Sequence, residues 1–432
     1  MSTPAGARLT RALQHRNFRL FFGGQSISLV GTWITRVATS WLIYRLTGSE
    51  LLLGVAGFVG QIPTLVITPF AGVLVDRMDR RKILLITQAG SLVQSAVLAV
   101  LTLSGLVTVT QIIVLQVFQG IINSFDTPAR QAFVSEMVAD REHLPNAIAL
   151  NSSMVNGSRV IGPSIGGLLI AAVGEGWCFA VDAVSYLAVI ASLLAMRVEP
   201  RPRHGAGDTH LLEELRHGWD YVLHSVPIRS VLILVAIVSV TGTPYTVLMP
   251  AFAAQVLHGG PNTLGILMAA TGVGALSGAL YLASRETVRG LVRILMWASL
   301  TFGVGLIAFS MTTSLWLACV ALAVGSGGLM VTLAGSNTIL QTIVEERLRG
   351  RVMSFYTMAF FGTVPIGSLI GGVIADRFGS PITVRLSGVV CLLAGAWFAS
   401  RVAAIRAVVR PIYRERGIPP AVPAVDTGGK TL

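Results

Sequence analysis

Apolar stretches of about 20 residues recur along almost the whole chain, and each is long enough to cross the hydrocarbon core of a bilayer as a helix. They lie near residues 20–44, 52–75, 83–104, 109–126, 148–172, 178–196, 230–254, 264–283, 293–311, 315–336, 353–375 and 383–404. Charged residues make up only 12% of the chain, against roughly 25% in soluble domains. A surface so poor in charge cannot be solvated by water. The sequence therefore predicts an all-α polytopic membrane protein with about twelve transmembrane helices.

The distribution of Arg and Lys predicts how these spans are oriented. With a cytoplasmic N-terminus, the basic segments 76–82 and 401–432 are cytoplasmic, and the outer loops hold only Arg45, Arg377 and Arg385. Short cytoplasmic loops carry the excess of Arg and Lys. We therefore expect a multi-pass protein of the inner (plasma) membrane with both termini in the cytoplasm.

The longest polar interruption divides the chain into two six-helix halves. Within it, Leu212, Leu215, Trp219 and Val222 share one helical face, as in a helix that lies on the membrane surface. The expected organisation is an N-terminal half (1–196), a cytoplasmic linker with an amphipathic helix (197–229), a C-terminal half (230–410) and a disordered cytoplasmic tail (411–432).

A glycine pattern occurs once in each half. Gly-x-x-x-Gly-Gly begins at Gly162 and again at Gly367, each time in the fifth predicted helix of its half. Internal repeats are typical of secondary transporters, whose halves move around a central site.

The loop between the second and third predicted helices combines a glycine, two acids and several basic residues. It reads Gly72-Val73-Leu74-Val75-Asp76-Arg77-Met78-Asp79-Arg80-Arg81-Lys82. This loop resembles the G-x-x-x-D-[RK]-x-G-[RK]-[RK] signature of the major facilitator superfamily, with Asp79 in place of the usual Gly. A loop that only obeyed charge asymmetry would need neither the acid nor the glycine.

The resemblance implies that this loop latches the outward-open state. The latch would consist of Gly72, Asp76, Arg77, Arg80, Arg81 and Asp126. Asp76 would stabilise the positive end of the eleventh helix, and Arg80 would meet Asp126 at the inner end of the fourth.

A second motif, in the fifth helix, is similar to the antiporter motif of the superfamily's exporters. It consists of Gly162, Pro163, Gly166 and Gly167. Small residues let helices approach closely, and proline bends a helix; ordinary helix packing is the alternative interpretation.

Further stretches narrow the resemblance to one branch of the superfamily. Asp126-Thr127-Pro128-Ala129-Arg130 and Arg349-Gly350-Arg351-Val352-Met353 look like the drug:proton antiporter-3 branch, which includes macrolide-type efflux proteins and the enterobactin exporter. The resemblance covers nearly the whole chain and implies the major facilitator fold and export.

Polar residues at helical spacing predict a central cavity, which helices 1, 4, 7 and 10 line in the superfamily. The candidates for lining it are Thr32 and Arg36 in helix 1, Gln116, Gln119 and Asn123 in helix 4, and Tyr245 and Met249 in helix 7. Apolar packing with incidental polar residues is the alternative for each helix. Gln116 stands where many proton-coupled relatives carry Arg, which argues against coupling by that residue.

Three charged residues lie clearly within predicted spans rather than close to their cytoplasmic or outer ends: Arg36, Arg159 and Asp182. Each costs about 2.5–3.5 kcal/mol or more at mid-membrane, so such residues are usually functional or paired. Arg36 has no evident partner and is the first candidate for a substrate or coupling contact. An Arg159–Asp182 pair is one possibility, and Asp182 is the candidate proton carrier.

Together these features favour a secondary active transporter that exports drug-like or amphipathic small molecules by alternating access, coupled to an ion that we expect to be the proton. The alternative is an exporter of a siderophore or another secreted metabolite. A membrane enzyme or an assembly factor is disfavoured, because the sequence has no H-E-x-x-H motif and no nucleotide-binding loop. We expect no cofactor, no metal and no nucleic acid; the partners are the substrate, the ion and the bilayer, and the protein is expected to be a monomer.

Overall fold

The computed structural model describes residues 11–138, 141–197, 220–285 and 287–415, and all regular elements in these ranges are helices. The long helices of the first half are α2 (Arg16–Thr47), α3 (Glu50–Arg77), α4 (Arg80–Leu103), α5 (Val109–Met137), α6 (Leu144–Val173) and α7 (Glu175–Ala195). Local signals set several of their ends. Ser49 caps α3 by accepting a hydrogen bond from the Leu52 amide, and Thr108 forms a capping box with Gln111 at the start of α5.

The second half has the same plan, with two of its spans interrupted. It contains α9 (Val226–Gly242), α10 (Pro244–Gln255), α11 (Pro261–Ala283), α12 (Leu291–Met311), α13 (Leu315–Ile343), α14 (Glu346–Thr357), the π-helical turn η3 (Met358–Gly362), α15 (Thr363–Phe378) and α16 (Ser380–Glu415). The seventh expected span divides into α9 and α10 at Thr243, because Pro244 has no amide hydrogen and its ring clashes with the preceding turn. The eleventh runs through α14, η3 and α15.

Counting α9–α10 and α14–α15 as one span each, the described residues form the two sets of six spans that the sequence predicted. Nine helical stretches of this part of the chain are long and apolar enough to cross a membrane. Those outside this group are α2, α5 and α6, and they carry many of the polar residues singled out from the sequence. The all-α polytopic fold is thereby confirmed.

One expected boundary differs in the structure, and another falls mostly on residues that the structure does not describe. Helix α16 continues to Glu415, beyond the expected start of the tail at residue 411. Most of the expected amphipathic linker helix lies outside the described residues; residues 220–224 at its end are helical.

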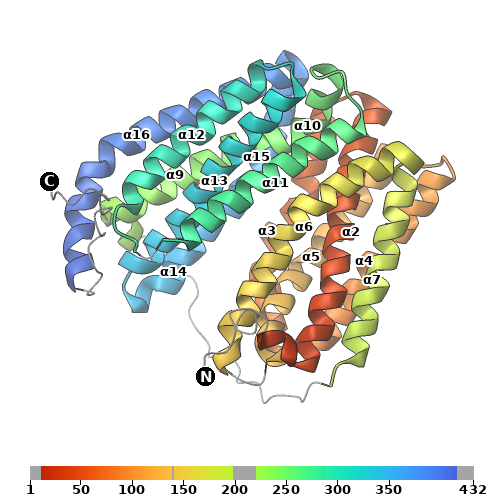
Figure 1. Cartoon of the computed structure of the whole chain (residues 1–432), viewed down its shortest axis with the longest axis horizontal. Coiled ribbons are helices and arrows are strands. Elements are labelled where there is room, and N and C mark those ends of the chain that lie inside the picture. The colour runs from red at the N-terminus through yellow and green to blue at the C-terminus, as the bar shows by residue number, and fades with distance from the viewer. Residues whose placement is uncertain (1–10, 139–140, 198–219, 286, 416–432) are drawn as a thin grey trace, which may run out of the picture.

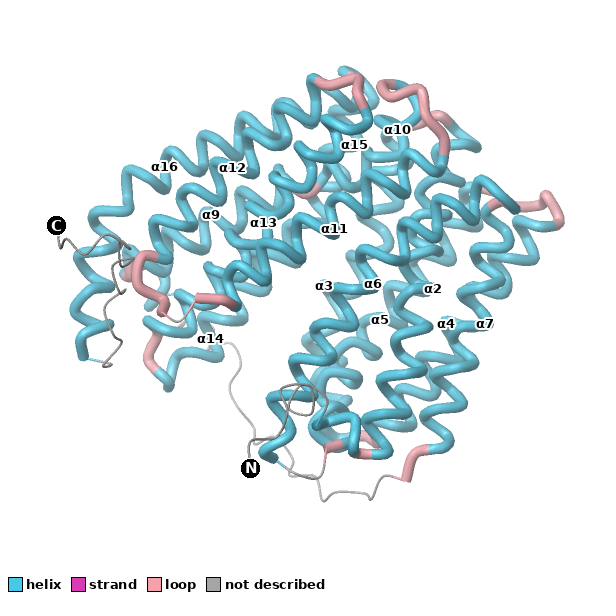
Figure 2. The backbone as a smooth tube through the Cα atoms, in the orientation of Figure 1, coloured by secondary structure: helices cyan, strands magenta, loops and turns pink. Residues whose placement is uncertain are grey.

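The halves form two bundles that touch at one end (Figure 1). In the first bundle, α2 packs on α6 and α7, and α4 packs on α5 and α7; in the second, α13 packs on α11 and α12, and α16 on α9 and α12. The main contacts between the halves are α6 with α11 and α3 with α15. We call the end where the bundles meet the closed end. At the opposite end, where α2 begins and α14 lies, the bundles diverge (Figures 1 and 2). We call it the arginine-rich end, after residues such as Arg80 at the start of α4, Arg289 before α12 and Arg349 in α14.

Candidate functional site: the space between the halves

The closed end is sealed by backbone contact at two helix crossings. A Cβ atom built on Gly167 of α6 would lie 2.7 Å from the Pro261 carbonyl oxygen and 3.0 Å from the Gly265 Cα in α11. A Cβ atom on Gly54 of α3 would lie 2.7 Å from the Gly372 Cα in α15. Side chains have no room at either crossing, so the two halves meet backbone to backbone.

The repeated glycine motif makes equivalent contacts in both halves. Its first glycine packs on the first span of its own half: Gly162 against Trp33 of α2, and Gly367 against Val240 of α9. Its last glycine, Gly167 or Gly372, crosses to the second span of the opposite half. The repeat seen in the sequence is therefore also a repeat of contacts, and it builds the closed end.

The contacts between the halves stop near mid-helix. Two of the contacts farthest from the closed end are those of Gly272 in α11 with the Arg159 carbonyl oxygen and of Gly362 with the Leu65 side chain. Beyond this level the two bundles diverge toward the arginine-rich end.

Two arginines at this level share one aromatic ring. The guanidinium carbon of Arg36 lies 4.4 Å from the centroid of the Trp33 ring, and that of Arg159 lies 5.8 Å from it. Both distances fit a cation–π contact. Both arginine side chains are exposed, and neither has an ion pair or a hydrogen bond to any described residue. The structure thus brings together two of the charged residues singled out from the sequence.

Asp182 lies apart from them, inside the first half. It is 1% exposed in α7 and accepts a hydrogen bond of 2.9 Å from the Ser95 hydroxyl of α4. The Ser185 hydroxyl lies 3.4 Å from its other oxygen. The Arg159–Asp182 pair considered from the sequence does not form among the described residues, since Arg159 is directed to Trp33 instead.

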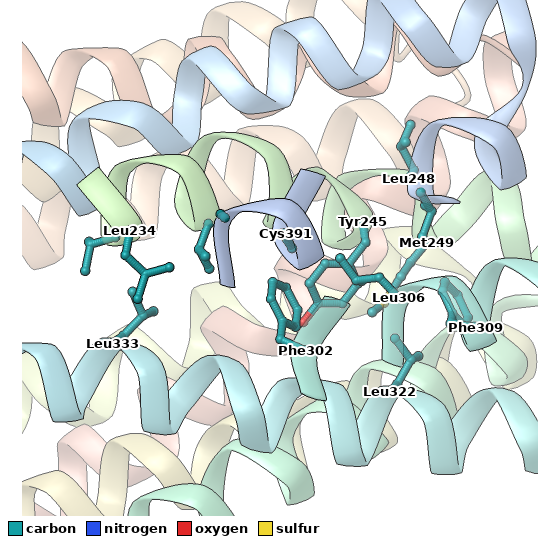
Figure 3. Close-up of a cluster of buried hydrophobic side chains, with 14 of the residues drawn as sticks. Leu234, Tyr245, Leu248, Met249, Phe302, Leu306, Phe309, Leu322, Leu333 and Cys391 are labelled. Carbon is teal, nitrogen blue, oxygen red and sulfur yellow. The ribbon is translucent and has the colours of Figure 1, made fainter. Parts of the chain in front are cut away.

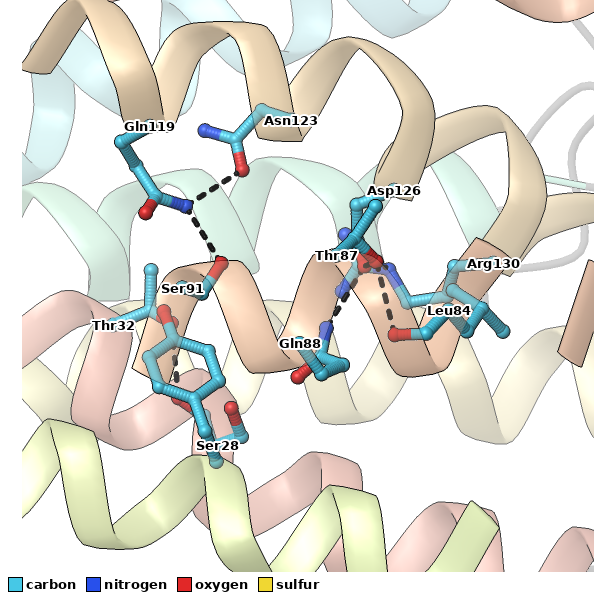
Figure 4. A network of polar contacts seen from close by, with 11 residues as sticks. Ser28, Thr32, Leu84, Thr87, Gln88, Ser91, Gln119, Asn123, Asp126 and Arg130 are labelled. Atoms are coloured by element: carbon cyan, nitrogen blue, oxygen red, sulfur yellow. Dashed lines mark hydrogen bonds and ion pairs between the residues drawn. The ribbon is translucent and has the colours of Figure 1, made fainter. Parts of the chain in front are cut away.

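The other polar candidates of the first half mainly join its own helices. The Gln119 side-chain amide donates to the Ser91 hydroxyl and to Asn123, at 3.1 Å each (Figure 4). The Thr32 hydroxyl donates to the Ser28 carbonyl oxygen at 3.0 Å. Gln116 is half-buried beside Gly60. Contact of these side chains with a substrate stays a prediction.

Tyr245 and Met249 lie in the apolar core of the second half (Figure 3). They are 2% and 1% exposed, and the Tyr245 ring packs edge-on against Phe302 with centroids 6.1 Å apart. Their helical spacing correctly places them on one face of the seventh span. In this state that face is covered by α12.

Comparison with known proteins identifies the fold and the family. A bacterial homologue of the human lysosomal transporter Spinster, in an inward-facing, unoccupied conformation, has a TM-score of 0.70 at 15% identity, covering 95% of this chain and 99% of that one. The nucleoside transporter NupG (D323A mutant) has a TM-score of 0.66 at 11% identity, covering 93% and 99%. The family model described as transmembrane secretion effector matches residues 10–411. The chain belongs to this family of major facilitator transporters.

Several curated relatives of this transporter are similar over most of their length. The Staphyloferrin A transporter of Staphylococcus aureus is 26% identical over 388 residues, covering 89% of this chain and 96% of the relative. The multidrug efflux pump Tap of Mycolicibacterium fortuitum is 28% identical over 375 residues, covering 84% and 90%. The enterobactin exporter EntS of Escherichia coli is 28% identical over 432 residues, covering 96% of each. The expected superfamily is confirmed.

In this family member, the loop that carries the superfamily signature is bound to its own half. The Arg80 guanidinium pairs with Glu136 at 2.7 Å, whereas Asp126 pairs with Arg130 at 3.5 Å. The expected Arg80–Asp126 contact is thus replaced by two others.

The other latch candidates in this loop make no contact with the second half that the structure describes. The Asp76 side chain lies outside the described residues, and Arg77 is exposed. A Cβ on Gly72 would meet nothing within 4 Å, so packing in this state does not require glycine there.

Asp79 and Arg81 have roles in this loop that the sequence motif did not reveal. The Asp79 carboxylate accepts hydrogen bonds from the Arg81 and Lys82 amides at 3.0 and 3.3 Å, which caps the start of α4. The Arg81 guanidinium donates to the Leu193 and Leu194 carbonyl oxygens at 2.8 and 3.0 Å, at the end of α7. An Asp directly before a helical run was a usable sequence signal for the cap, but the partner of Arg81 is distant in the chain.

We expect Arg81→Ala to destabilise the first half. The substitution leaves two carbonyl groups at the end of α7 without this donor and removes a positive charge from a helix C-terminus, at a cost of about 1–3 kcal/mol. The midpoint of SDS-induced unfolding in mixed micelles, followed by tryptophan fluorescence, measures the loss. Arg77→Ala is the matched control, since Arg77 is exposed. Equal midpoints for the two variants would contradict the capping role.

Proposed function

We propose that the protein exports an amphipathic small molecule across the plasma membrane by alternating access, driven by the proton gradient. The observation that carries the proposal is the pair of glycine crossings, which seal one end of the space between the halves while the other end is open. The printed names of the relatives, which include a multidrug efflux pump and a siderophore exporter, support export.

We place the arginine-rich end in the cytoplasm. This assignment follows the positive-inside rule and makes the present state inward-open, ready to take up solute from the cell. A cysteine introduced at His258, between α10 and α11, should then react with a membrane-impermeant maleimide in intact cells. Labelling in opened cells alone would reverse the assignment.

Export can be tested without knowing the substrate. Inverted vesicles containing the protein are incubated with a cell extract and energised by an inward-acid proton gradient, and the solutes retained inside are identified by mass spectrometry. We expect at least one solute to accumulate over vesicles without the protein, and a protonophore to abolish the accumulation. If no solute is enriched, the proposal of export is wrong.

Asp182 is our candidate for the coupling carboxylate. It is a buried acid whose described side-chain partners are hydroxyl groups, and a buried carboxylate without a cation is costly to ionise. Asp182→Asn keeps the shape and the hydrogen bond from Ser95 but cannot exchange a proton.

We therefore expect Asp182→Asn to lose most of the proton-driven accumulation, about tenfold or more, while exchange of solute down its own gradient continues. Both rates are measured in the same inverted vesicles. Asp220→Asn, which changes an exposed acid, serves as the control. Proton-driven accumulation at the wild-type level in Asp182→Asn would move the coupling site elsewhere.

A further inference from the structure

The pair of arginines around Trp33 is built by two different helices. Arg36 follows Trp33 by three residues in α2, so the two side chains lie on the same helical face. Gly162 of α6 packs directly against the Trp33 Cβ, and Arg159 lies one turn before Gly162. The missing side chain at Gly162 thus lets α6 approach closely enough for Arg159 to reach the same ring.

This arrangement concentrates positive charge. The two guanidinium groups contact the same ring, so their like charges repel each other, and no described acid pairs with either one. Two described acids within the spans of the first half are engaged elsewhere: Asp126 pairs with Arg130, and Asp182, which is 1% exposed, accepts a hydrogen bond from Ser95. Holding two unpaired like charges at mid-helix is unfavourable, and a bound anion would relieve that cost.

We propose that Trp33, Arg36 and Arg159 form a binding site for an organic anion, such as a carboxylate or phenolate attached to a flat apolar body. The inference rests on the proposed export function and specifies its substrate class. Stacking on Trp33 orients the Arg36 guanidinium, whose edge N–H groups can then bind a carboxylate in bidentate fashion. Arg159 supplies the second charge from the neighbouring helix.

The site also discriminates between classes of solute. A basic amphiphile would bring a third positive charge next to two others, which disfavours its binding. A neutral solute would leave the repulsion between the arginines in place. Among the functions considered for this chain, export of an acidic secreted metabolite therefore agrees with the site better than export of a basic drug.

Binding to the purified protein tests the site independently of transport. The probes are 2-naphthoate, its methyl ester and 2-naphthylmethylamine, which share one ring system and differ in charge. Equilibrium dialysis in maltoside micelles, corrected with empty micelles, should show retention of the naphthoate above the other two. Arg36→Gln and Arg159→Gln should each raise the Kd for naphthoate about tenfold, the factor expected for one charge-assisted contact. Arg36→Lys should recover part of the affinity.

Arg401→Gln is the matched control. Arg401 also lies over a tryptophan ring, Trp397, at 6.0 Å, but on α16, outside the space between the halves. Its substitution should leave naphthoate binding unchanged. Equal retention of the three probes, retention of none, or an unchanged Kd in Arg36→Gln would overturn the anion site. If naphthoate binding depends on Arg36 but vesicles that contain the protein accumulate no solute, the anion site is supported. In that case only the proposal of export is wrong.

Discussion

Gly167→Leu should abolish transport by holding the closed end open. A Cβ at this position would already lie 2.7 Å from the Pro261 carbonyl oxygen, and the atoms it meets are backbone atoms that cannot rotate away. Leucine adds three further carbons at the same point. The two halves must therefore separate at the closed end, which favours the state that is open there rather than at the arginine-rich end. Since alternating access needs both states, we expect no measurable transport from a protein that still inserts.

The separation can be detected at the other crossing. Ser368 of α15 is 1% exposed and packs against Gly54 and Gly57 of α3. In a chain without Cys178, Cys319 and Cys391, a cysteine placed at Ser368 should react faster with an impermeant maleimide from the outer face when Gly167 is leucine.

Gly157→Leu is the control for adding leucine to α6, because a Cβ there would meet nothing within 4 Å. It should change neither labelling nor transport. Unaltered labelling at residue 368 in the Gly167 variant would show that the crossing does not hold the closed end.

We expect Asp126→Ala to destabilise the first half, lowering its free energy of unfolding by about 3–5 kcal/mol. The Asp126 carboxylate accepts hydrogen bonds from Thr87 at 2.9 Å and Gln88 at 2.8 Å and pairs with Arg130 at 3.5 Å (Figure 4). Asp126 is 6% exposed. Its removal leaves the Arg130 guanidinium and the Gln88 amide without this acceptor in a poorly hydrated place, whereas the Thr87 hydroxyl keeps the Leu84 carbonyl oxygen at 3.0 Å.

Two further variants test whether the loss of stability comes from the Asp126 network. Asp79→Ala makes the same chemical change at the cap of α4 and should cost only about 1 kcal/mol. Asp126→Asn keeps an oxygen for Gln88 and Thr87 but loses the charge, so it should fall between the two. The midpoint of SDS-induced unfolding ranks the three variants. If Asp126→Ala costs no more than Asp79→Ala, the network does not stabilise the α4–α5 contact.

The sequence was most informative where one physical requirement dominates. Spans could be placed because a bilayer demands long apolar helices, and the glycine motif at Gly162 and Gly367 predicted close packing because only small residues permit it. Arg36 stood out because an unpaired charge is rare in a span. In the structure its side chain is exposed and lies over the Trp33 ring.

Other features depend on contacts that a linear pattern does not determine. Helical spacing placed Tyr245 and Met249 on one face of the seventh span. The spacing alone does not determine whether that face lines a cavity or packs on another helix. In the structure it packs in the core. Likewise, Arg80 had more than one acid within reach along the fold. The structure selects Glu136, which no spacing rule distinguishes from Asp126. The break at Thr243 had a local signal in Pro244, but an apolar run on both sides concealed it.

The equivalent glycine crossings have a consequence for ancestry. A six-helix chain that paired with a second copy of itself would form the same crossing twice, because a two-fold symmetric pair repeats every contact. Joining two copies in one gene removes that constraint, since a substitution at one crossing is no longer copied to the other. Here α2 and α6 run without interruption, whereas their counterparts in the second half are broken at Thr243 and at η3. Duplication thus lets one half stay stiff and the other acquire bending points while both crossings persist.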